Sequence, residues 1–454
     1  MKKSRFLNII KGNSEYLLHN TLYGTMVKAK CDITREIADN LDTVEYDEGN
    51  EFHKALKDLR MLVDENVNES SLLNYHFAEL NRSNLLVILI VTRQCNFRCT
   101  YCYEKHENKK MDREIYENLK NAIAAEIDYK GYKSVTLSFF GGEPMLEYDE
   151  IVNFMEELQK IGKEKNVHID GSMTTNGYDL TIDKFTKLVN LNVYDFQITI
   201  DGFRETHDKN RFLVGGGGTW QRIIDNLKAA KASDLNFRIT LRANIDNAAA
   251  LTVREFLGFL SENFVAIAAD AAAENSENFN ISDTENSDTV QSDSRFLVHF
   301  EAVKKMGGEL DDKLDVCNDE GGLITDVIDF AAELDLPAIN YSPAPFANMC
   351  YASKTNTMVL DTNGTIMKCT VAIDSPHNEV GKLTAEGFDI DDATICNWTS
   401  SPLPKECGEC PILAICYGKK CPMATWQGEL RKPEDCQKHI RIYESFMCNS
   451  CKVV

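Results

Sequence analysis

Short apolar runs alternate with amphipathic stretches between residues 85 and 245, a pattern typical of repeated β-α units around a parallel sheet. The apolar runs predict strands at Leu85–Val91, Val135–Phe140, His168–Met173, Val193–Ile200 and Phe237–Ala243. Amphipathic helices are predicted between them, for example at Arg113–Asp128 and Asp149–Gly162. Crossovers that all run in one direction predict an open or partial barrel, with its chemistry at the carboxyl ends of the strands.

The pattern changes on both sides of this region. The first 80 or so residues predict a small separate module, with strands followed by helices at residues 33–41 and 51–62. From Ala266 to Ser294 there are seven acidic residues and no Lys or Arg, which indicates a surface loop before or within a sixth β-α unit. From Pro343 onward the chain is rich in loops and holds ten of the fifteen cysteines, so we expect metal centres to replace a hydrophobic core there.

Charge and composition narrow the class of protein. The chain has 454 residues, with 49 Lys and Arg against 71 Asp and Glu and a net charge of -22, which argues against a nucleic-acid partner. No signal peptide and no run of about 18 apolar residues is visible, so we predict a cytoplasmic protein without a membrane partner. In a reducing compartment, fifteen cysteines favour metal ligation over disulfides.

Three cysteines follow the first predicted barrel strand directly. Cys95, Cys99 and Cys102 are separated by three and then two residues. A cubane iron–sulfur cluster normally takes four thiolates, so three would leave one iron open to chelate a small molecule through amine and carboxylate groups. A zinc site lacking one ligand, or a set of buried thiols, is the alternative, but zinc spacings usually consist of two separated pairs.

This loop resembles the signature of the radical SAM superfamily, in which a C-x3-C-x2-C loop follows the first strand of a partial barrel. Further landmarks of that family end the second, third and fourth predicted strands, at residues 141–144, 174–177 and 198–202. The resemblance implies that S-adenosylmethionine (SAM) lies against these loops, with Glu143 accepting a hydrogen bond from the methionine amine and with Thr199 and Asp201 near the ribose. The SAM contacts implied in this way are Gly141, Gly142, Glu143, Asn176, Thr199 and Asp201.

The segment after the fourth strand is less specific. Arg211 and Arg242 are candidates for the SAM carboxylate, with surface salt bridges as the favoured role. The glycine run at residues 215–218 lacks the Lys-Ser/Thr ending of a phosphate-binding loop, so we interpret it as a flexible turn.

Seven cysteines of the C-terminal part resemble the SPASM extension of radical SAM enzymes, which houses two auxiliary clusters. The family pattern implies an outer cluster on Cys407, Cys410, Cys416 and Cys436, and an inner cluster on Cys350, Cys369 and Cys421. The spacing departs from that pattern, with four rather than three residues before Cys421. No cysteine between Cys350 and Cys369 supplies a fourth inner ligand, so an open inner iron could bind a substrate thiolate.

The remaining cysteines leave several interpretations open. Two zinc ribbons are the alternative to the auxiliary clusters, because C-x2-C pairs also suit zinc. Cys448 and Cys451 would complete a cluster or remain free. For Cys31, Cys317 and Cys396, buried structural thiols are the default interpretation.

Residues 14–43 resemble the winged-helix peptide-recognition region at the front of many radical SAM peptide maturases. Such modules bind leader peptides by adding a strand to a sheet edge. A plain stabilising subdomain is the alternative. The predicted divisions are a recognition module at 1–82, a partial (β/α)6 barrel at 83–300, a bridge at 301–345 and a SPASM domain at 346–454.

Taken together, the chain resembles radical SAM/SPASM peptide maturases that form thioethers of the sactipeptide or ranthipeptide type. The resemblance implies three 4Fe–4S clusters, SAM, a precursor peptide with a leader, and an electron donor such as flavodoxin or ferredoxin. SAM cleavage would give a 5'-deoxyadenosyl radical that takes hydrogen from the peptide, whose cysteine sulfur then closes the thioether. The sequence does not identify a general base.

Three other functions remain open. Anaerobic sulfatase maturases oxidise a protein Ser or Cys, but they place a catalytic Asp directly after the second inner cysteine, where this chain has Thr370. Carbon–carbon crosslinking of a peptide is the second alternative. An iron–sulfur electron carrier is the alternative that is not an enzyme.

Overall fold

The computed structural model describes residues 1–43, 45–266, 293–306, 308, 311–317, 322–400, 403, 405–418, 421–423, 436, 440–444 and 447. Most of the predicted loop at 266–294 and the pair Cys448 and Cys451 lie outside the described residues. Within the described part of the chain, no helix has the length and apolar character needed to cross a membrane.

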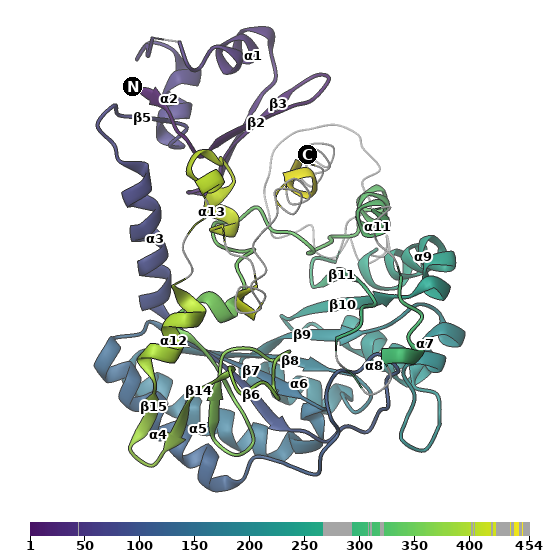
Figure 1. Cartoon of the computed structure of the whole chain (residues 1–454). Coiled ribbons are helices and arrows are strands. Elements are labelled where there is room, and N and C mark those ends of the chain that lie inside the picture. Colours follow the sequence, from purple (N-terminus) through teal and green to yellow (C-terminus); the bar gives the residue numbers. More distant parts are fainter. Residues whose placement is uncertain are drawn as a thin grey trace.

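Six neighbouring parallel strands form one side of a ten-stranded sheet, with β11 (Phe296–Ala302) at its edge (Figure 1). In chain order they are β6 (Asn84–Thr92), β7 (Ser134–Gly141), β8 (His168–Thr175), β9 (Val193–Thr199), β10 (Arg238–Ile245) and β11 (Phe296–Ala302). The first five confirm the predicted strands, with bounds that differ by one or two residues. The sixth strand begins at Phe296, so the acidic segment predicted at residues 266–294 precedes β11 in the chain.

Helices between the strands cover the outside of this sheet (Figure 1). Asp112 caps α4 by accepting a hydrogen bond from Ile115 N (3.0 Å), and Gly131 ends it with a φ of 69° that glycine adopts without strain. The same helix buries Leu119 and Ile123 in the main core. The helices that link successive strands are α4 (Arg113–Lys130), α5 (Tyr148–Lys165), α6 (Ile182–Asn190), α7 (Arg204–Asn210), α8 (Trp220–Lys231) and α9 (Asn247–Leu260).

The N-terminal module contains the predicted strands and helices. An antiparallel sheet has the order β2 (Leu7–Lys11), β3 (Tyr16–Asn20) and β4 (Thr25–Ala29), followed by α1 (Asp32–Asp39) and α2 (Glu51–Asp58). Two short strands, β1 (Lys2–Lys3) and β5 (Leu62–Val63), pair beside it. Helix α3 (Glu69–Ser83) runs from this module to β6 (Figure 1). The sequence pattern did not predict this helix, because it buries only Glu69 and Leu73 and therefore lacks a clear apolar face.

The C-terminal part extends the main sheet. Strand β12 (Thr357–Leu360) runs parallel to β6, and β13 (Thr365–Met367), β14 (Glu379–Thr384) and β15 (Gly387–Ile390) continue the sheet in antiparallel fashion. Leu360, Ile366 and Leu383 join the main hydrophobic core. The expectation that metal centres replace a hydrophobic core throughout this region is therefore wrong for residues 357–390. Helices α11 (Leu323–Glu333), α12 (Asp392–Thr399) and α13 (Leu413–Cys416) also belong to this part of the chain, and residues 440–444 are helical as well.

The N-terminal sheet lies against the cysteine-bearing segment around α13 (Figure 1). Asn8 Nδ2 and Thr21 Oγ1 both donate to the carbonyl of Pro411, at 3.2 and 2.6 Å. Arg5 donates to the carbonyl of Gly408 at 2.5 Å. The N-terminal module thus holds the backbone on either side of Cys410.

Candidate iron–sulfur and SAM site

The loop that carries Cys95, Cys99 and Cys102 leaves the carboxyl end of β6 and pairs with residues 210–214. Backbone hydrogen bonds join Arg98 N to Phe212 O, Thr100 N to Asn210 O and Val214 N to Asn96 O, each at 2.9 Å. These contacts fix the loop at the carboxyl ends of the parallel strands. The glycine run at residues 215–218 forms the turn beyond this pairing, as predicted.

Gly141 and Gly142 let the end of β7 approach the cysteine loop closely. A Cβ added at Gly142 would lie 2.5 Å from the carbonyl carbon of Gln94, and Gly141 has a φ of 114°. Gly142 N donates to Thr92 O at 3.0 Å and Glu143 N donates to Gln94 O at 2.8 Å. A side chain at Gly142 would push away the residue that precedes Cys95, which explains a glycine at this position.

The side chain of Glu143 is 1% exposed and joins the ends of β7 and β8. Its carboxylate accepts hydrogen bonds from Met145 N (2.9 Å), Thr175 Oγ1 (2.6 Å) and Asn176 N (2.7 Å). Burial raises the pKa of Glu143, and these three donors oppose that rise. A carboxylate offers about four lone-pair positions, so one acceptor position remains for a ligand amine.

Asn176 connects β8 to the cysteine loop. Its Nδ2 donates to Asn96 Oδ1 at 2.7 Å, and its Oδ1 accepts from Tyr178 N at 2.9 Å. The predicted SAM contacts from the second and third strands therefore meet beside Cys95.

A second group of predicted residues converges on Tyr101, which lies between Cys99 and Cys102. The Tyr101 hydroxyl donates to Asp201, and it accepts from Arg211 (2.8 Å) and Asn244 Nδ2 (3.1 Å). Asp201 also accepts from Asn244 N at 2.8 Å. Burial raises the pKa of Asp201, and the charge of Arg211 opposes that rise. The sequence interpretation did not include Tyr101 or Asn244; a tyrosine inside the cysteine triplet was the available signal.

Arg211 departs from the predicted surface role. It is 7% exposed, so the expected surface salt bridge is wrong for this residue. Among the described residues, its buried Nε has no hydrogen-bond partner, which suits an arginine that meets a ligand carboxylate. Arg242 is half-buried and donates to Asn244 Oδ1 at 3.0 Å. Thr199 is buried and is the strand partner of Arg242.

The thiols of Cys95, Cys99 and Cys102 are partly buried, and Cys95 interacts electrostatically with the other two. Burial is the main cause that raises the pKa of all three, and the pKa of Cys102 reaches about 12. Nearby carboxylates act in the same direction on each thiol, whereas the charge of Arg211 opposes the rise at Cys99 and Cys102. Crowded thiols of this kind ionise when a bound cation compensates the charge.

The arrangement of the three thiols fits a centre that contains several metal ions. Within the described ranges, no three His, Cys, Asp or Glu side chains converge on a position that a single metal ion could occupy. A 4Fe–4S cluster binds each thiolate through a different iron, so it does not require such convergence. The triplet loop fits a cluster with an amino-acid ligand beside it, because Glu143 keeps an open acceptor position and Arg211 Nε has no hydrogen-bond partner in the part of the chain that the structure describes.

The predicted inner thiols are brought together by the fold. Electrostatic interactions join the thiols of Cys350, Cys369 and Cys421. The first and the last of these cysteines are 71 residues apart in the chain. Burial raises the pKa of Cys350 to about 11, and the thiols of Cys421 and Cys369 act in the same direction. Asn378 is fully buried and fixes the backbone of Cys369 by accepting from its N–H (2.9 Å) and donating to its carbonyl (2.7 Å).

The other C-terminal cysteines have mixed environments. Cys407 and Cys416 are buried, and Cys410 N donates to Cys407 O at 3.2 Å. Cys436 is half-buried and helical. Outside the predicted clusters, Cys317 is buried as expected, whereas Cys31 and Cys396 are exposed, so the buried interpretation is wrong for those two.

A cavity of about 170 Å³ lies between the residues that follow Cys102 and those that follow Cys369. Arg93 fixes one wall through two hydrogen bonds to the carboxylate of Asp361, at 3.1 and 2.5 Å. Burial raises the pKa of Glu104 to about 7, although Arg93 lowers it. The cavity is lined by Arg93, Tyr103, Glu104, Lys105, Met306 and residues 371–375.

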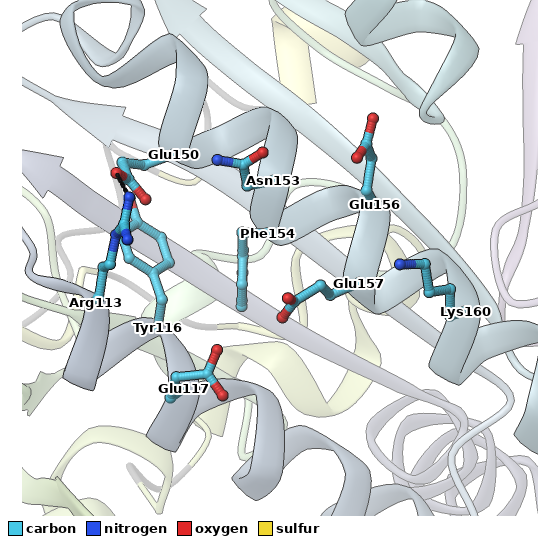
Figure 2. Close-up of a pocket in the computed structure, with 9 residues that line it drawn as sticks. All are labelled: Arg113, Tyr116, Glu117, Glu150, Asn153, Phe154, Glu156, Glu157 and Lys160. Carbon is cyan, nitrogen blue, oxygen red and sulfur yellow. Dashed lines mark hydrogen bonds and ion pairs between the residues drawn. The ribbon is translucent and has the colours of Figure 1, made fainter.

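A larger groove of about 350 Å³ lies on the outer helices, between α4 and α5. Figure 2 shows its charged side chains and the ion pair between Arg113 and Glu150 (3.5 Å). None of the predicted site residues lines this groove, so its size does not make it the reactive site.

Comparison with known proteins agrees with this geometry. Residues 89–245 match the sequence model of the radical SAM superfamily. The cysteine-type anaerobic sulfatase-maturating enzyme of Clostridium novyi is 28% identical over 173 residues, which is 36% of this chain and 44% of that protein. GTP 3',8-cyclase of Rhizobium meliloti is 32% identical over 155 residues, 33% of this chain and 41% of that protein. The chain thus spans less than half the length of each of these two relatives.

A solved structure extends the comparison of the fold. The structure described as native anSMEcpe with bound AdoMet and Cp18Cys peptide aligns with a TM-score of 0.57 and 18% identity, over 82% of this chain and 99% of that one. The likeness therefore includes the fold beyond the barrel. The matched residues include the cysteine loop at the end of β6 and most of the parallel strands, so this part of the chain is similar to the radical SAM superfamily, a family that implies a 4Fe–4S cluster and SAM.

Proposed function

We propose that this protein is a radical SAM peptide maturase that joins a cysteine sulfur of a precursor peptide to a carbon atom of the same peptide. One observation carries the proposal. Tyr103, next to Cys102, and Val371, two residues after Cys369, line the same cavity. The triplet loop and the inner thiols therefore meet at adjacent residues, and the 170 Å³ cavity lies between them.

The residues of the barrel opening would bind and orient the cofactors. Cys95, Cys99 and Cys102 would hold the first cluster, Glu143 would accept from the methionine amine, and Arg211 would pair with the carboxylate. Asp201 would lie at the ribose, held by Tyr101. When bound, the cluster and SAM supply a 5'-deoxyadenosyl radical, so the protein's task is to aim that radical and keep water away.

The cavity is the proposed location of the reacting peptide residues. Its walls combine apolar groups such as Met306 and Val371 with the charged groups of Arg93, Glu104 and Asp374. Walls of this mixed kind accept one or two side chains and leave polar groups for the peptide backbone. Cys350, Cys369 and Cys421 would hold the inner auxiliary cluster beside it, and Cys407, Cys410, Cys416 and Cys436 the outer one.

The N-terminal sheet is the proposed leader-binding element. Strand β4 is at one edge of the order β2-β3-β4, and a leader could add to that edge through backbone hydrogen bonds. The link from this sheet to Pro411 would then connect leader binding with the segment that carries Cys407 and Cys410. An electron donor such as flavodoxin or ferredoxin would reduce the first cluster.

The test uses the full chain, reconstituted anaerobically with iron and sulfide and supplied with SAM, dithionite and a short cysteine-bearing peptide encoded near its gene. We expect about twelve iron atoms per chain, since three cubanes hold four each. We also expect 5'-deoxyadenosine, and a peptide that loses two hydrogen atoms and no longer reacts with thiol alkylators. Changing Cys95, Cys99 and Cys102 together to Ala should remove one cluster and all 5'-deoxyadenosine. Four iron atoms per chain, or SAM cleavage without these cysteines, would contradict the proposal.

Oxidation of a protein Ser or Cys, as in sulfatase maturation, is the second candidate. The match to the sulfatase-maturating enzyme of Clostridium novyi favours it. Thr370 opposes it, because the hydroxyl of Thr370 lies 2.8 Å from the Tyr351 hydroxyl where that family is expected to have a carboxylate. Trapping an aldehyde on the product with a hydrazine would support this candidate, whereas a thioether leaves no aldehyde.

A further inference from the structure

The cavity of about 170 Å³ contains one acidic side chain that no other described residue pairs with. Glu104 lines this cavity and is half-buried. Within the described part of the chain, its carboxylate forms no hydrogen bond and no ion pair. A carboxylate that loses water without gaining a donor is unfavourable, so this position is stabilised when a bound ligand supplies the donor.

The two cations that line the same cavity are already paired with other groups. Arg93 donates to three carboxylates, those of Asp361 (3.1 and 2.5 Å), Glu107 (3.1 Å) and Asp374 (3.3 Å). Lys105 Nζ lies 2.9 Å from the second carboxylate oxygen of Asp374. Neither cation therefore compensates the charge of Glu104 by direct contact.

Apolar side chains form another part of the cavity wall. Met306 and Val371 are 44% and 39% exposed, and Ile373 is half-buried beside them. The fold thus gathers open apolar surface and one unpaired carboxylate in the same small space. Lys and Arg side chains match both kinds of wall, because their methylene groups pack against apolar surface while the charged end meets a polar partner.

We propose that this cavity selects a cationic residue of the precursor peptide, with Glu104 binding the ammonium group of a Lys or the guanidinium group of an Arg. The inference rests on the proposed function, in which the cavity holds peptide residues. Glu104 is then a residue that determines specificity, because an uncharged or acidic side chain in the same place leaves its carboxylate without a partner. Glu104 follows Cys102 by two residues and Val371 follows Cys369 by two, so the cationic residue should lie close to the crosslinked residues of the peptide.

The first part of the test changes only the peptide. The full chain, reconstituted anaerobically with iron and sulfide, is supplied with SAM, dithionite and the cysteine-bearing peptide encoded near its gene. Each Lys and Arg of this peptide is replaced in turn by norleucine, which keeps an apolar stem and removes the charge. At one position we expect kcat/KM for crosslinking to fall by about tenfold or more. A crosslinked peptide that contains no Lys or Arg, or that keeps its rate after every replacement, would overturn the inference.

Variants of the protein assign the preference to Glu104. In Glu104→Gln the charge is removed at nearly constant size, so the cationic and the norleucine peptides should be crosslinked with about equal kcat/KM. Glu104→Asp keeps the charge and should retain a preference for the cationic peptide. The ratio of two peptides on one variant does not depend on how much of that variant is folded. An unchanged ratio in Glu104→Gln would therefore refute the role of Glu104.

Glu107→Gln is the matched control. Glu107 belongs to the same loop, but it is paired with Arg93 (3.1 Å) and Lys109 (3.0 Å) and does not line the cavity. The same loss of one negative charge should leave the parent's preference for the cationic peptide. A loss of preference in Glu107→Gln equal to that in Glu104→Gln would overturn the inference, because it would indicate a general effect of charge.

The outcomes separate this inference from the proposed function. A product that carries an aldehyde and no thioether, with a cationic preference that disappears in Glu104→Gln, would refute the proposed reaction and support the inference. Equal thioether formation from the cationic and the norleucine peptides would support the proposed reaction and refute the inference. A parent protein that modifies none of the peptides would contradict both.

Discussion

Replacement of Gly142 by alanine gives a direct test of how the second strand supports the cysteine loop. The new Cβ would lie 2.5 Å from the carbonyl carbon of Gln94. Carbon atoms in contact prefer a separation of about 3.5 Å, so the segment before Cys95 must move by about 1 Å. The movement opposes two hydrogen bonds, from Gly142 N to Thr92 O (3.0 Å) and from Glu143 N to Gln94 O (2.8 Å).

The expected cost follows from these contacts. Overpacking of a tight site costs about 1–3 kcal/mol. Two weakened backbone hydrogen bonds add about 1 kcal/mol each. We therefore expect Gly142→Ala to lower the free energy of unfolding by about 3–5 kcal/mol, a large part of the stability of an ordinary domain. The displaced loop should also hold less iron after reconstitution.

Urea denaturation of the apoprotein and iron analysis of the reconstituted protein measure the two effects. Gly258→Ala is the matched control, because a Cβ there meets open space within α9. Alanine in a helix should stabilise that variant by about 0.5–1 kcal/mol. If Gly142→Ala kept the parent's stability and full iron content, the close approach of β7 to the cysteine loop would not be what positions the thiols.

Three further changes test other parts of the site. Arg93→Ala removes the partner of Asp361, whose side chain is 8% exposed, and should cost about 3–5 kcal/mol in urea denaturation; an unaffected midpoint would contradict the role of this buried pair. Tyr101→Phe removes the hydroxyl that joins Asp201, Arg211 and Asn244 and should weaken SAM binding by about tenfold in equilibrium dialysis, or about 1.4 kcal/mol; an equal affinity would refute that link. Burial lowers the pKa of His19 to about 4 from 6.5, so the unfolded chain takes up the proton first and stability should fall by up to about 3 kcal/mol as the pH drops from 6.5 to 4. His19→Phe should flatten that part of the pH profile, and a profile that does not change would show that His19 is not its source.

The sequence alone predicted the repeated β-α pattern because each strand of the barrel is a continuous apolar run between amphipathic helices. Parallel strands buried on both faces require such runs, so β6 to β10 are visible without a structure. The triplet of Cys95, Cys99 and Cys102 was visible for a similar reason, since all three ligands lie within one short loop. Local spacing carries the information in both cases.

Some features depend on contacts between distant segments. The strand β12 is only four residues long, and its pairing with β6 joins positions more than 250 residues apart, so no local pattern predicts it. The burial of Arg211 arises from the pairing of residues 210–214 with the cysteine loop. A sequence pattern places Arg211 after a helix with other polar residues, where a surface role is the ordinary expectation.

Thus the sequence by itself determined the resemblance to the radical SAM superfamily, the run of parallel strands and the first group of thiols, because these depend on residues that are neighbours in the chain. Only the tertiary structure decided that Tyr101 joins Asp201 to Arg211, that Tyr351 and Thr370 meet at Cys369, and that the N-terminal sheet holds the backbone beside Cys410. The physical reason is that hydrogen bonds and burial depend on distances in space, and these are set by the packing of the whole chain.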